Sequence, residues 1–203
     1  GIDLRDNPLN ERKKVLNSYF NKNRSPLFLS ETIKFRKWEE LNELRDISDN
    51  QIHEGVMIKL TSSPYISGRP RGKWFKWKRN PKIVDAIIMY AQRGHGKRSS
   101  FYSDYTFGVF NKDEELVPIG KAYSGFTDEE LNRLDKFVRT KTTNRFGPVR
   151  EVEKTLVVEI AFDDISFSKR HKSGIALRFP RFKRIRWDKP VNEVETLEQI
   201  TKS

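Results

Sequence analysis

The segment that decides the fold is Ile83–Gln92, which reads IVDAIIMYAQ and forms a strand-like apolar run. More runs of the same kind follow it along the chain, namely Ser103–Phe110, Val117–Tyr123, Thr155–Phe162 and Ile175–Phe179. Short runs rich in β-branched and aromatic residues are typical of strands. The sequence therefore predicts five strands in this part of the chain.

One helix is predicted between the third and the fourth of these strands. Thr127 is its expected N-cap, because Glu130 three residues later completes a capping box. The apolar stripe of the helix consists of Leu131, Leu134, Phe137 and Val138. Five strands with one helix in this position follow the order of an OB-fold barrel, in which the helix packs as a plug.

Upstream of Asn80-Pro81 the pattern is mixed. The expected elements are a helix at Pro8–Phe20, a strand at Leu27–Ile33, a helix at Lys37–Leu44, a strand at Val56–Leu60 and a strand at Trp74–Lys78. A proline after Asn80 breaks regular structure at the point where the pattern changes. The predicted fold class is therefore α+β followed by mainly β, with two domains at residues 1–80 and 81–203.

The chain is strongly basic. Its 203 residues include 40 Lys and Arg against 28 Asp and Glu, which gives a net charge of +12 and a pI of about 9.8. This surplus predicts a polyanionic partner, with nucleic acid as the leading candidate, because each cation set against a phosphate releases counterions. The basic residues are spread over strand-like segments rather than along an amphipathic helix, which disfavours membrane binding.

The composition also indicates where in the cell the protein is located. The mean hydropathy of −0.76 and the lack of a long apolar run exclude a transmembrane helix. The sequence contains no cysteine, so it has neither a disulfide framework nor a thiolate zinc site, and Gly1–Asp6 does not resemble a signal peptide. We therefore expect an intracellular protein, located in the cytoplasm with the nucleoid or in the nucleus.

A carboxylate and two lysines form the first candidate site. Glu54 precedes a glycine and a strand, and it is suited to coordinate Mg²⁺ beside a phosphate, with room for a ligand next to the glycine. The segment Lys73–Lys78 alternates basic and large apolar residues, so a strand places Lys76 and Lys78 on one face with Trp74. These groups predict an electrostatic site for phosphate transfer. A solvated glutamate before an ordinary strand is the alternative.

The second candidate is Arg178–Pro190, which reads RFPRFKRIRWDKP. Its six cationic side chains repel one another unless anions lie nearby, and a phosphate ligand is the natural anion. The alternative is a barrel strand whose apolar residues point inward and whose basic face is solvated. Both interpretations stay open from the residues alone.

The third candidate is the loop Gln92–Ser100, which contains glycines together with Arg93, Lys97 and Arg98. A basic loop between two strands is suited to grip a nucleic-acid backbone without reading bases. The three histidines of the chain have neither metal-ligand spacing nor a nucleophile signature near them, so we predict no catalytic role for them.

Taken together, these segments resemble successive motifs of ATP-dependent DNA ligases, over almost the whole chain. The matching motifs are Glu54–Lys59 (EGVMIK), Ser63–Tyr65 with Gly68-Arg69, Lys73–Lys78 (KWFKWK) and Arg178–Lys189, of which the last is the most specific. In that family an adenylation domain precedes an OB-fold domain. The resemblance implies that residues 1–80 are the C-terminal part of the adenylation (nucleotidyltransferase) domain and residues 81–203 the OB-fold domain.

The resemblance also implies a role for each matching residue. Glu54 would hold Mg²⁺, and Lys76 and Lys78 would contact the α-phosphate of ATP. Arg178 and Lys189 would orient the leaving pyrophosphate, which completes the set of expected catalytic residues. The residues expected to bind ATP are Lys59, Arg69, Lys76, Lys78, Arg178, Arg181 and Lys189. The residues expected to bind DNA are Arg93, Lys97, Arg98, Arg184 and Arg186.

One element of the family is absent from the sequence. The nucleophile of these ligases is the lysine of a Lys-x-Asp-Gly element, and none occurs here. The resemblance therefore implies a C-terminal fragment of a ligase that seals nicked duplex DNA through enzyme-adenylate and DNA-adenylate intermediates. The missing N-terminal half of the adenylation domain is its expected partner, and the chain alone is not expected to adenylate itself.

Two other functions stay open. A non-catalytic nucleic-acid-binding module would clamp DNA with the barrel and the basic loops, but pure binding does not need Glu54, Lys76 and Lys78. Part of an RNA ligase or a capping-type nucleotidyltransferase would share the two-domain plan, although the run Arg178–Lys189 resembles the DNA enzymes more closely.

Overall fold

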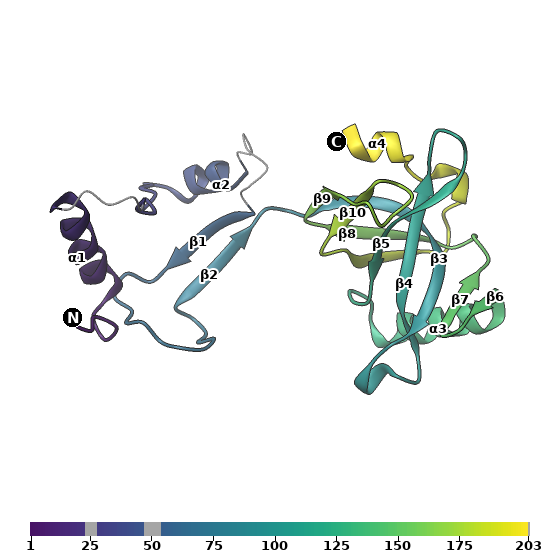
Figure 1. Ribbon diagram of the computed structural model, residues 1–203, viewed down its shortest axis with the longest axis horizontal. Helices are drawn as coiled ribbons and strands as arrows, with labels where there is room; N and C mark the ends of the chain where they lie inside the picture. The colour runs from purple at the N-terminus through teal and green to yellow at the C-terminus, as the bar shows by residue number, and fades with distance from the viewer. Residues whose placement is uncertain (23–27, 47–53, 203) are drawn as a thin grey trace. The chain divides into compact units, whose positions relative to one another are not determined.

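The computed structural model describes residues 1–22, 28–46 and 54–202, and the chain divides into two compact units, Gly1–Arg79 and Asn80–Ser203 (Figure 1). The described residues of the first unit form two helices and a β-hairpin, whereas the second unit is built mainly of strands. This agrees with the predicted order of α+β followed by mainly β. Among the described residues, no helix is long and apolar enough to cross a membrane.

The hairpin of the first unit pairs β1 (Gly55–Lys59) with β2 (Trp74–Lys78) in antiparallel register. Helix α1 (Leu9–Lys22) is tied to the loop after β1, because the N–H of Leu9 donates to the carbonyl of Ser63 at 2.9 Å. The first amides of a helix have no partner within the helix, so this bond fixes where α1 begins.

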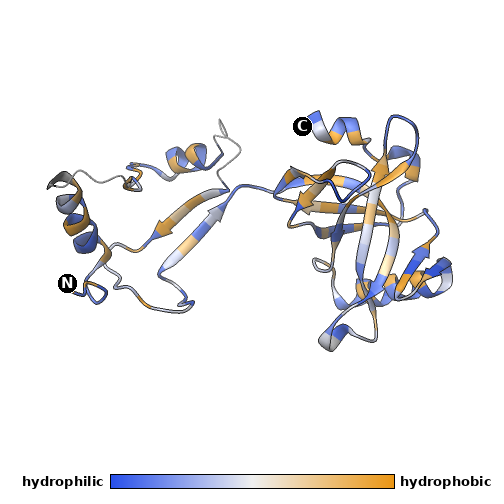
Figure 2. Ribbon diagram, in the orientation of Figure 1, coloured by the Kyte–Doolittle hydropathy of each residue, from blue (hydrophilic) through white to orange (hydrophobic). Residues whose placement is uncertain are grey.

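Helix α2 (Trp38–Asp46) packs on one face of this hairpin. The Trp77 ring of β2 lies 6.1 Å from the Trp38 ring and 5.0 Å from the guanidinium carbon of Arg45, both measured to ring centroids. Because side chains alternate along a strand, the two lysines of β2 point to the opposite face. Figure 2 shows β1 as largely hydrophobic and β2 as mixed.

The strand predicted at Leu27–Ile33 is wrong for the part that the structure describes. Residues 28–33 have no regular structure, and the Phe28 side chain is 99% exposed. Leu27 itself lies outside the described residues. A strand needs a neighbour for its backbone hydrogen bonds, and within the described ranges β1 and β2 pair only with each other. The other predicted elements of this unit are confirmed to within two residues.

The second unit is an antiparallel sheet with the strand order β11-β8-β3-β4-β5. A β6–β7 ribbon joins it through β7, which also pairs with β3, and a separate hairpin pairs β9 with β10. The strands are β3 (Lys82–Arg93), β4 (Tyr102–Phe110), β5 (Leu116–Ala122), β6 (Thr142–Phe146), β7 (Val149–Val152), β8 (Val157–Phe162), β9 (Asp164–Phe167), β10 (Ile175–Arg178) and β11 (Arg181–Arg186). The helical segments are η1 (Gly96–Arg98), α3 (Asp128–Lys141), η2 (Val191–Glu193) and α4 (Leu197–Lys202).

The two edges of this sheet meet. The N–H of Phe182 in β11 donates to the carbonyl of Ser124, just after β5, at 2.9 Å. Gly125 permits this approach, since its φ is +98° and a Cβ there would lie 2.0 Å from the Phe182 carbonyl oxygen. The sheet thus closes into the barrel that the OB-fold prediction requires.

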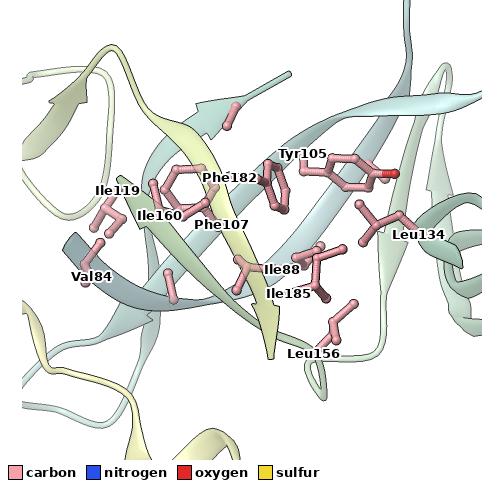
Figure 3. Packing of buried hydrophobic residues seen from close by; sticks show 14 of the residues in the cluster. Val84, Ile88, Tyr105, Phe107, Ile119, Leu134, Leu156, Ile160, Phe182 and Ile185 are labelled. Carbon is pink, nitrogen blue, oxygen red and sulfur yellow. The ribbon is translucent and has the colours of Figure 1, made fainter. Parts of the chain in front are cut away.

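Helix α3 closes the barrel interior, as predicted. The capping box of Thr127 and Glu130 is present, and Leu131, Leu134 and Val138 are buried. Figure 3 shows Leu134 beside Tyr105 in a core that also contains Val84, Ile88, Phe107, Ile119, Leu156, Ile160, Phe182 and Ile185. The core is thus built by the barrel strands and one face of α3.

One strand of the prediction has to be corrected. The fifth strand of the barrel is β11, whereas the predicted run Ile175–Phe179 forms β10 in the separate hairpin. The buried residues of β11, Phe182 and Ile185, are three positions apart because a bulge between Phe182 and Arg184 shifts the register. The barrel-strand interpretation of the final basic run therefore holds for residues 181–186.

Candidate functional site

Three predicted site residues lie at one end of the β1–β2 hairpin. Glu54 directly precedes β1, and Lys76 and Lys78 share one face of β2. The Lys78 Nζ lies 3.8 Å from Glu54 Oε2, and both side chains are about half exposed. A pocket of about 160 Å³ is lined there by Glu54, Gly55, Val56, Met57, Lys76, Trp77 and Lys78. One carboxylate and two ammonium groups leave this pocket net positive, so it suits a phosphate.

Gly55 allows the backbones of β1 and β2 to approach each other closely. Its φ is +138°, and a Cβ at this position would lie 2.3 Å from the carbonyl oxygen of Trp77. The space next to the glycine, which the sequence suggested for a ligand, is therefore filled by the backbone of β2. This close approach holds Glu54 next to Lys78 at the open end of the hairpin.

The other two predicted ATP-binding residues of this unit differ in their surroundings. The ammonium of Lys59 lies 4.4 Å from the centroid of the Trp74 ring, directly across the ladder. Lys59 lies on the same face of the hairpin as Lys76 and Lys78 but is not among the residues that line the pocket. Arg69 is exposed in the loop between the strands and makes no ion pair with any residue that the structure describes.

The pocket offers Mg²⁺ a single carboxylate ligand. Within the described ranges, no three Asp, Glu, His or Cys side chains are grouped to hold a metal ion, so Glu54 offers a single protein ligand. Mg²⁺ often keeps several waters and is held by one or two carboxylates together with substrate phosphates. The pocket therefore suits a metal that arrives with a nucleotide.

The final basic run is largely neutralised by carboxylates of its own unit. Arg181 Nη1 lies 3.0 Å from Asp163 Oδ1, and Lys183 Nζ lies 2.9 Å from Glu159 Oε1. These partners come from β8 and the residue after it, next to which β11 runs. Part of the repulsion that suggested a phosphate is therefore already offset within the barrel.

The carboxylate of Asp85 contacts both of the last two cations of the run. Its Oδ2 accepts a hydrogen bond from Lys189 Nζ at 2.6 Å and lies 3.7 Å from Arg186 Nη1. The Asp85 carboxylate raises the pKa of Lys189, because the hydrogen bond favours the charged ammonium. Asp85 is buried, and its Oδ1 has no hydrogen-bond partner among the described residues. Lys189 is thus held in the barrel by a carboxylate that sequence analysis did not select.

One feature of the sequence could have identified Asp85 as part of a buried ion pair. Asp85 is the only charged residue of the run Ile83–Gln92. A buried carboxylate needs a partner, so a lone aspartate in an apolar strand predicts a cation nearby. That cation is 104 positions away along the chain, and nothing local identifies it.

The remaining two cations of the run are exposed. Arg178 ends β10, with its guanidinium carbon 5.4 Å from the centroid of the Phe179 ring. Phe179 has a φ of +50°, so the chain turns sharply between β10 and β11. Arg184 points outward from β11 and forms no salt bridge with the described residues.

The loop after β3 is compact. The N–H of Gly94 donates to the carbonyl of Phe101 at 3.1 Å, and η1 lies between them with Lys97 in its middle. Arg93 stacks 5.8 Å from Tyr102, and Arg98 lies 5.3 Å from Phe126, measured to the ring centroids. These two cations are held against aromatic rings, at the end of the barrel where β3 and β4 connect.

Two family models match the chain. One, described as the ATP dependent DNA ligase domain, matches residues 1–78, and the other, the ATP dependent DNA ligase C terminal region, matches residues 98–189. The DNA ligase of Archaeoglobus fulgidus is 37% identical over 98% of this chain and 35% of its own length. The probable DNA ligase of Koribacter versatilis is 47% identical over 79% of this chain and 28% of its own length. The chain thus spans about a third of these relatives.

Solved structures agree on the fold. A structure from work on DNA binding by Lig E DNA ligases has a TM-score of 0.61 at 19% identity, over 89% of this chain and 59% of that one. The ligase domain of M. tuberculosis LigD has a TM-score of 0.50 at 22% identity, over 96% and 62%. The adenylation-plus-OB-fold architecture is thus supported by fold as well as by sequence. Since models of both domains match in the same order, the chain belongs to the family of ATP-dependent DNA ligases.

Proposed function

We propose that this chain is the part of an ATP-dependent DNA ligase that grips the phosphates of ATP and the backbone of a nicked duplex. The observation that carries the proposal is the pocket that Glu54, Lys76 and Lys78 line together. A nucleic-acid-binding module has no use for a half-exposed carboxylate in the same pocket as two lysines. A phosphate-transfer site does, because a metal and cations must offset charge on the same phosphate.

Lys76 and Lys78 contact the α-phosphate of ATP in this proposal. A lysine amine attacks the α-phosphorus, the bond to the β-phosphate oxygen breaks, and pyrophosphate leaves. The two ammonium groups offset the charge that develops on the α-phosphate. Arg178 and Lys189 orient the leaving pyrophosphate, and Lys59, Arg69 and Arg181 add contacts to the nucleotide.

Glu54 would hold Mg²⁺ in this proposal, as a single carboxylate that shares the ion with the phosphates of a nucleotide. When bound, the ion offsets negative charge on the phosphates that react. Glu54 lies 3.8 Å from Lys78, so it also holds that ammonium group at the pocket.

The attacking lysine comes from outside these 203 residues, since they contain no Lys-x-Asp-Gly element. We therefore assign the N-terminal half of the adenylation domain as the partner that supplies it. AMP then passes to the 5′-phosphate of the nick. The 3′-hydroxyl attacks this phosphate, which seals the strand and releases AMP. Nicked duplex DNA is gripped by Arg93, Lys97, Arg98, Arg184 and Arg186. A ligase of this kind serves replication, repair and recombination in the cytoplasm or the nucleus.

The test is formation of the enzyme-adenylate in the full-length ligase that contains these residues. Lys76→Ala removes one cation from the α-phosphate, and we expect the rate of labelling by α-labelled ATP to fall about 10²- to 10³-fold, as when one electrostatic donor is lost elsewhere. Lys14→Ala, an exposed lysine on α1, is the matched control and should label normally. Undiminished labelling of the Lys76→Ala protein would contradict the assignment.

The nature of the nucleic acid is tested separately. Nicked DNA and nicked RNA duplexes of one sequence compete for the full-length ligase in the same reaction. The proposal predicts that DNA is sealed in preference. Preferential sealing of RNA would favour an RNA-end enzyme with the same two-domain plan.

A further inference from the structure

The loop Ser168–Gly174 between β9 and β10 carries a cluster of cations that sequence analysis did not select. It reads SKRHKSG, and Lys169, Arg170 and Lys172 are all exposed. None of these three cations has an ion-pair partner in the part of the chain that the structure describes. The final basic run differs, because Arg181, Lys183, Arg186 and Lys189 each lie within 4 Å of a carboxylate. The loop therefore carries three neighbouring cations whose charge no carboxylate of the described residues offsets.

The loop is closed by a hydrogen bond between its two ends, and one end is bonded to the barrel. The N–H of Ser168 donates to the carbonyl of Gly174 at 2.9 Å, which closes the loop. The hydroxyl of Ser173 donates to the carbonyl of Pro118 in β5 at 2.6 Å. A pinned loop presents its cations without a large ordering cost on binding.

A fully exposed aromatic residue lies at the base of this loop. Phe167 is 100% exposed, although it pairs across the ladder with buried Ile175. An apolar ring left in water beside three cations suits a partner that is anionic and also offers an apolar surface. Duplex DNA does so, because sugar edges and base edges lie between its phosphates.

We propose that Phe167 and the loop Ser168–Gly174 form a contact surface for the backbone of duplex DNA. Lys169, Arg170 and Lys172 bind phosphates, and the Phe167 ring packs against the groove edge between them. The surface rests on the proposed function, which supplies DNA as the polyanion. It is separate from the residues of the loop after β3, so it adds grip on the duplex without reading its sequence.

The experiment measures binding of the 203-residue chain to a fluorescent nicked duplex over a series of salt concentrations. The triple variant Lys169→Ala/Arg170→Ala/Lys172→Ala should bind at least tenfold more weakly near physiological salt. The slope of log affinity against log salt should become shallower by about 2 to 3, since each phosphate contact contributes about 0.9. Phe167→Ala should weaken binding with the slope unchanged, because it removes no charge.

The matched control removes the same charge elsewhere. The variant Lys121→Ala/Lys141→Ala/Lys154→Ala loses three cations that are paired with Asp104, Glu153 and Glu151. We expect its salt slope to change by less than about 1. Equal losses in the two triple variants would overturn the surface alone and leave the proposed function standing. Absence of any salt-dependent binding by the unaltered chain would overturn the surface and the DNA part of the proposed function together.

Discussion

Asp85 and Lys189 form the residue-scale contact that joins the start of the barrel to its last cations. Replacing Asp85 by Asn leaves Lys189 and Arg186 beside each other without the carboxylate that both contact. Breaking one side of a buried ion pair commonly costs about 3 kcal/mol or more, so we expect a loss of that size in urea unfolding. Asp104→Asn, which breaks a pair with half-exposed Lys121, is the control and should cost less than about 1 kcal/mol. An Asp85→Asn protein as stable as the unaltered chain would refute this role.

The same contact predicts a pH dependence. The hydrogen bond to Asp85 raises the pKa of Lys189 above the ordinary lysine value of 10.5. A pKa raised by folding means that the pair stabilises the fold fully below pH 10.5 and loses this effect as the pH rises through the raised value. We therefore expect the urea midpoint of the unaltered chain to fall more steeply above pH 10.5 than that of Asp85→Asn. Parallel declines in the two proteins would contradict the assignment.

At the scale of elements, the capping box of α3 is a contact that the sequence identified and the structure contains. The N–H of Glu130 donates to Thr127 Oγ1 at 3.2 Å, and Glu130 Oε2 accepts from the N–H of Thr127 at 2.8 Å. Thr127→Ala should therefore cost about 1 kcal/mol of unfolding free energy in urea. Glu130→Gln keeps an acceptor for the same bond and should cost less. A larger loss in Glu130→Gln than in Thr127→Ala would show that charge, rather than capping, matters there.

Elements with a regular apolar pattern or local caps were predictable, whereas several elements without them were not. Strand β3 is long and apolar, and α3 carries its own capping residues, so both follow from the sequence. Strand β11 was predicted only as an alternative and was not counted among the five barrel strands, because its bulge breaks the alternation of period two. Strand β6 has four exposed residues out of five, so no apolar pattern distinguishes it from a loop.

The candidate site residues likewise include contacts that a local pattern predicts and contacts that it does not. Lys76 and Lys78 are two positions apart on one strand, so the period of a strand alone places them together. Glu54 joins them because β1 and β2 are adjacent in one hairpin. The link from Asp85 to Lys189 depends on barrel closure over 104 positions, which no local pattern contains. The exposure of Phe167 likewise depends on where β9 ends relative to the barrel.

At the scale of the whole molecule, the two units differ in how many hydrophobic side chains they bury. The buried clusters lie entirely in the second unit, whereas Leu41 is the one buried hydrophobic side chain among the described residues of the first. Many large apolar residues of the first unit are exposed, including Val15, Tyr19, Met57 and Phe75. We expect the amides of β1 and β2 to exchange with deuterium much faster than those of β3, β4 and β8. Equal protection of the two units would contradict this difference.

The most direct test of the account is the location of the AMP after incubation with α-labelled ATP and Mg²⁺. The 203-residue chain alone should remain unlabelled, because it contains no Lys-x-Asp-Gly element. The full-length ligase that includes these residues should carry AMP on the lysine of that element, as found by mass spectrometry of the labelled peptide. Labelling of the 203-residue chain alone, on any of its own lysines, would contradict the account.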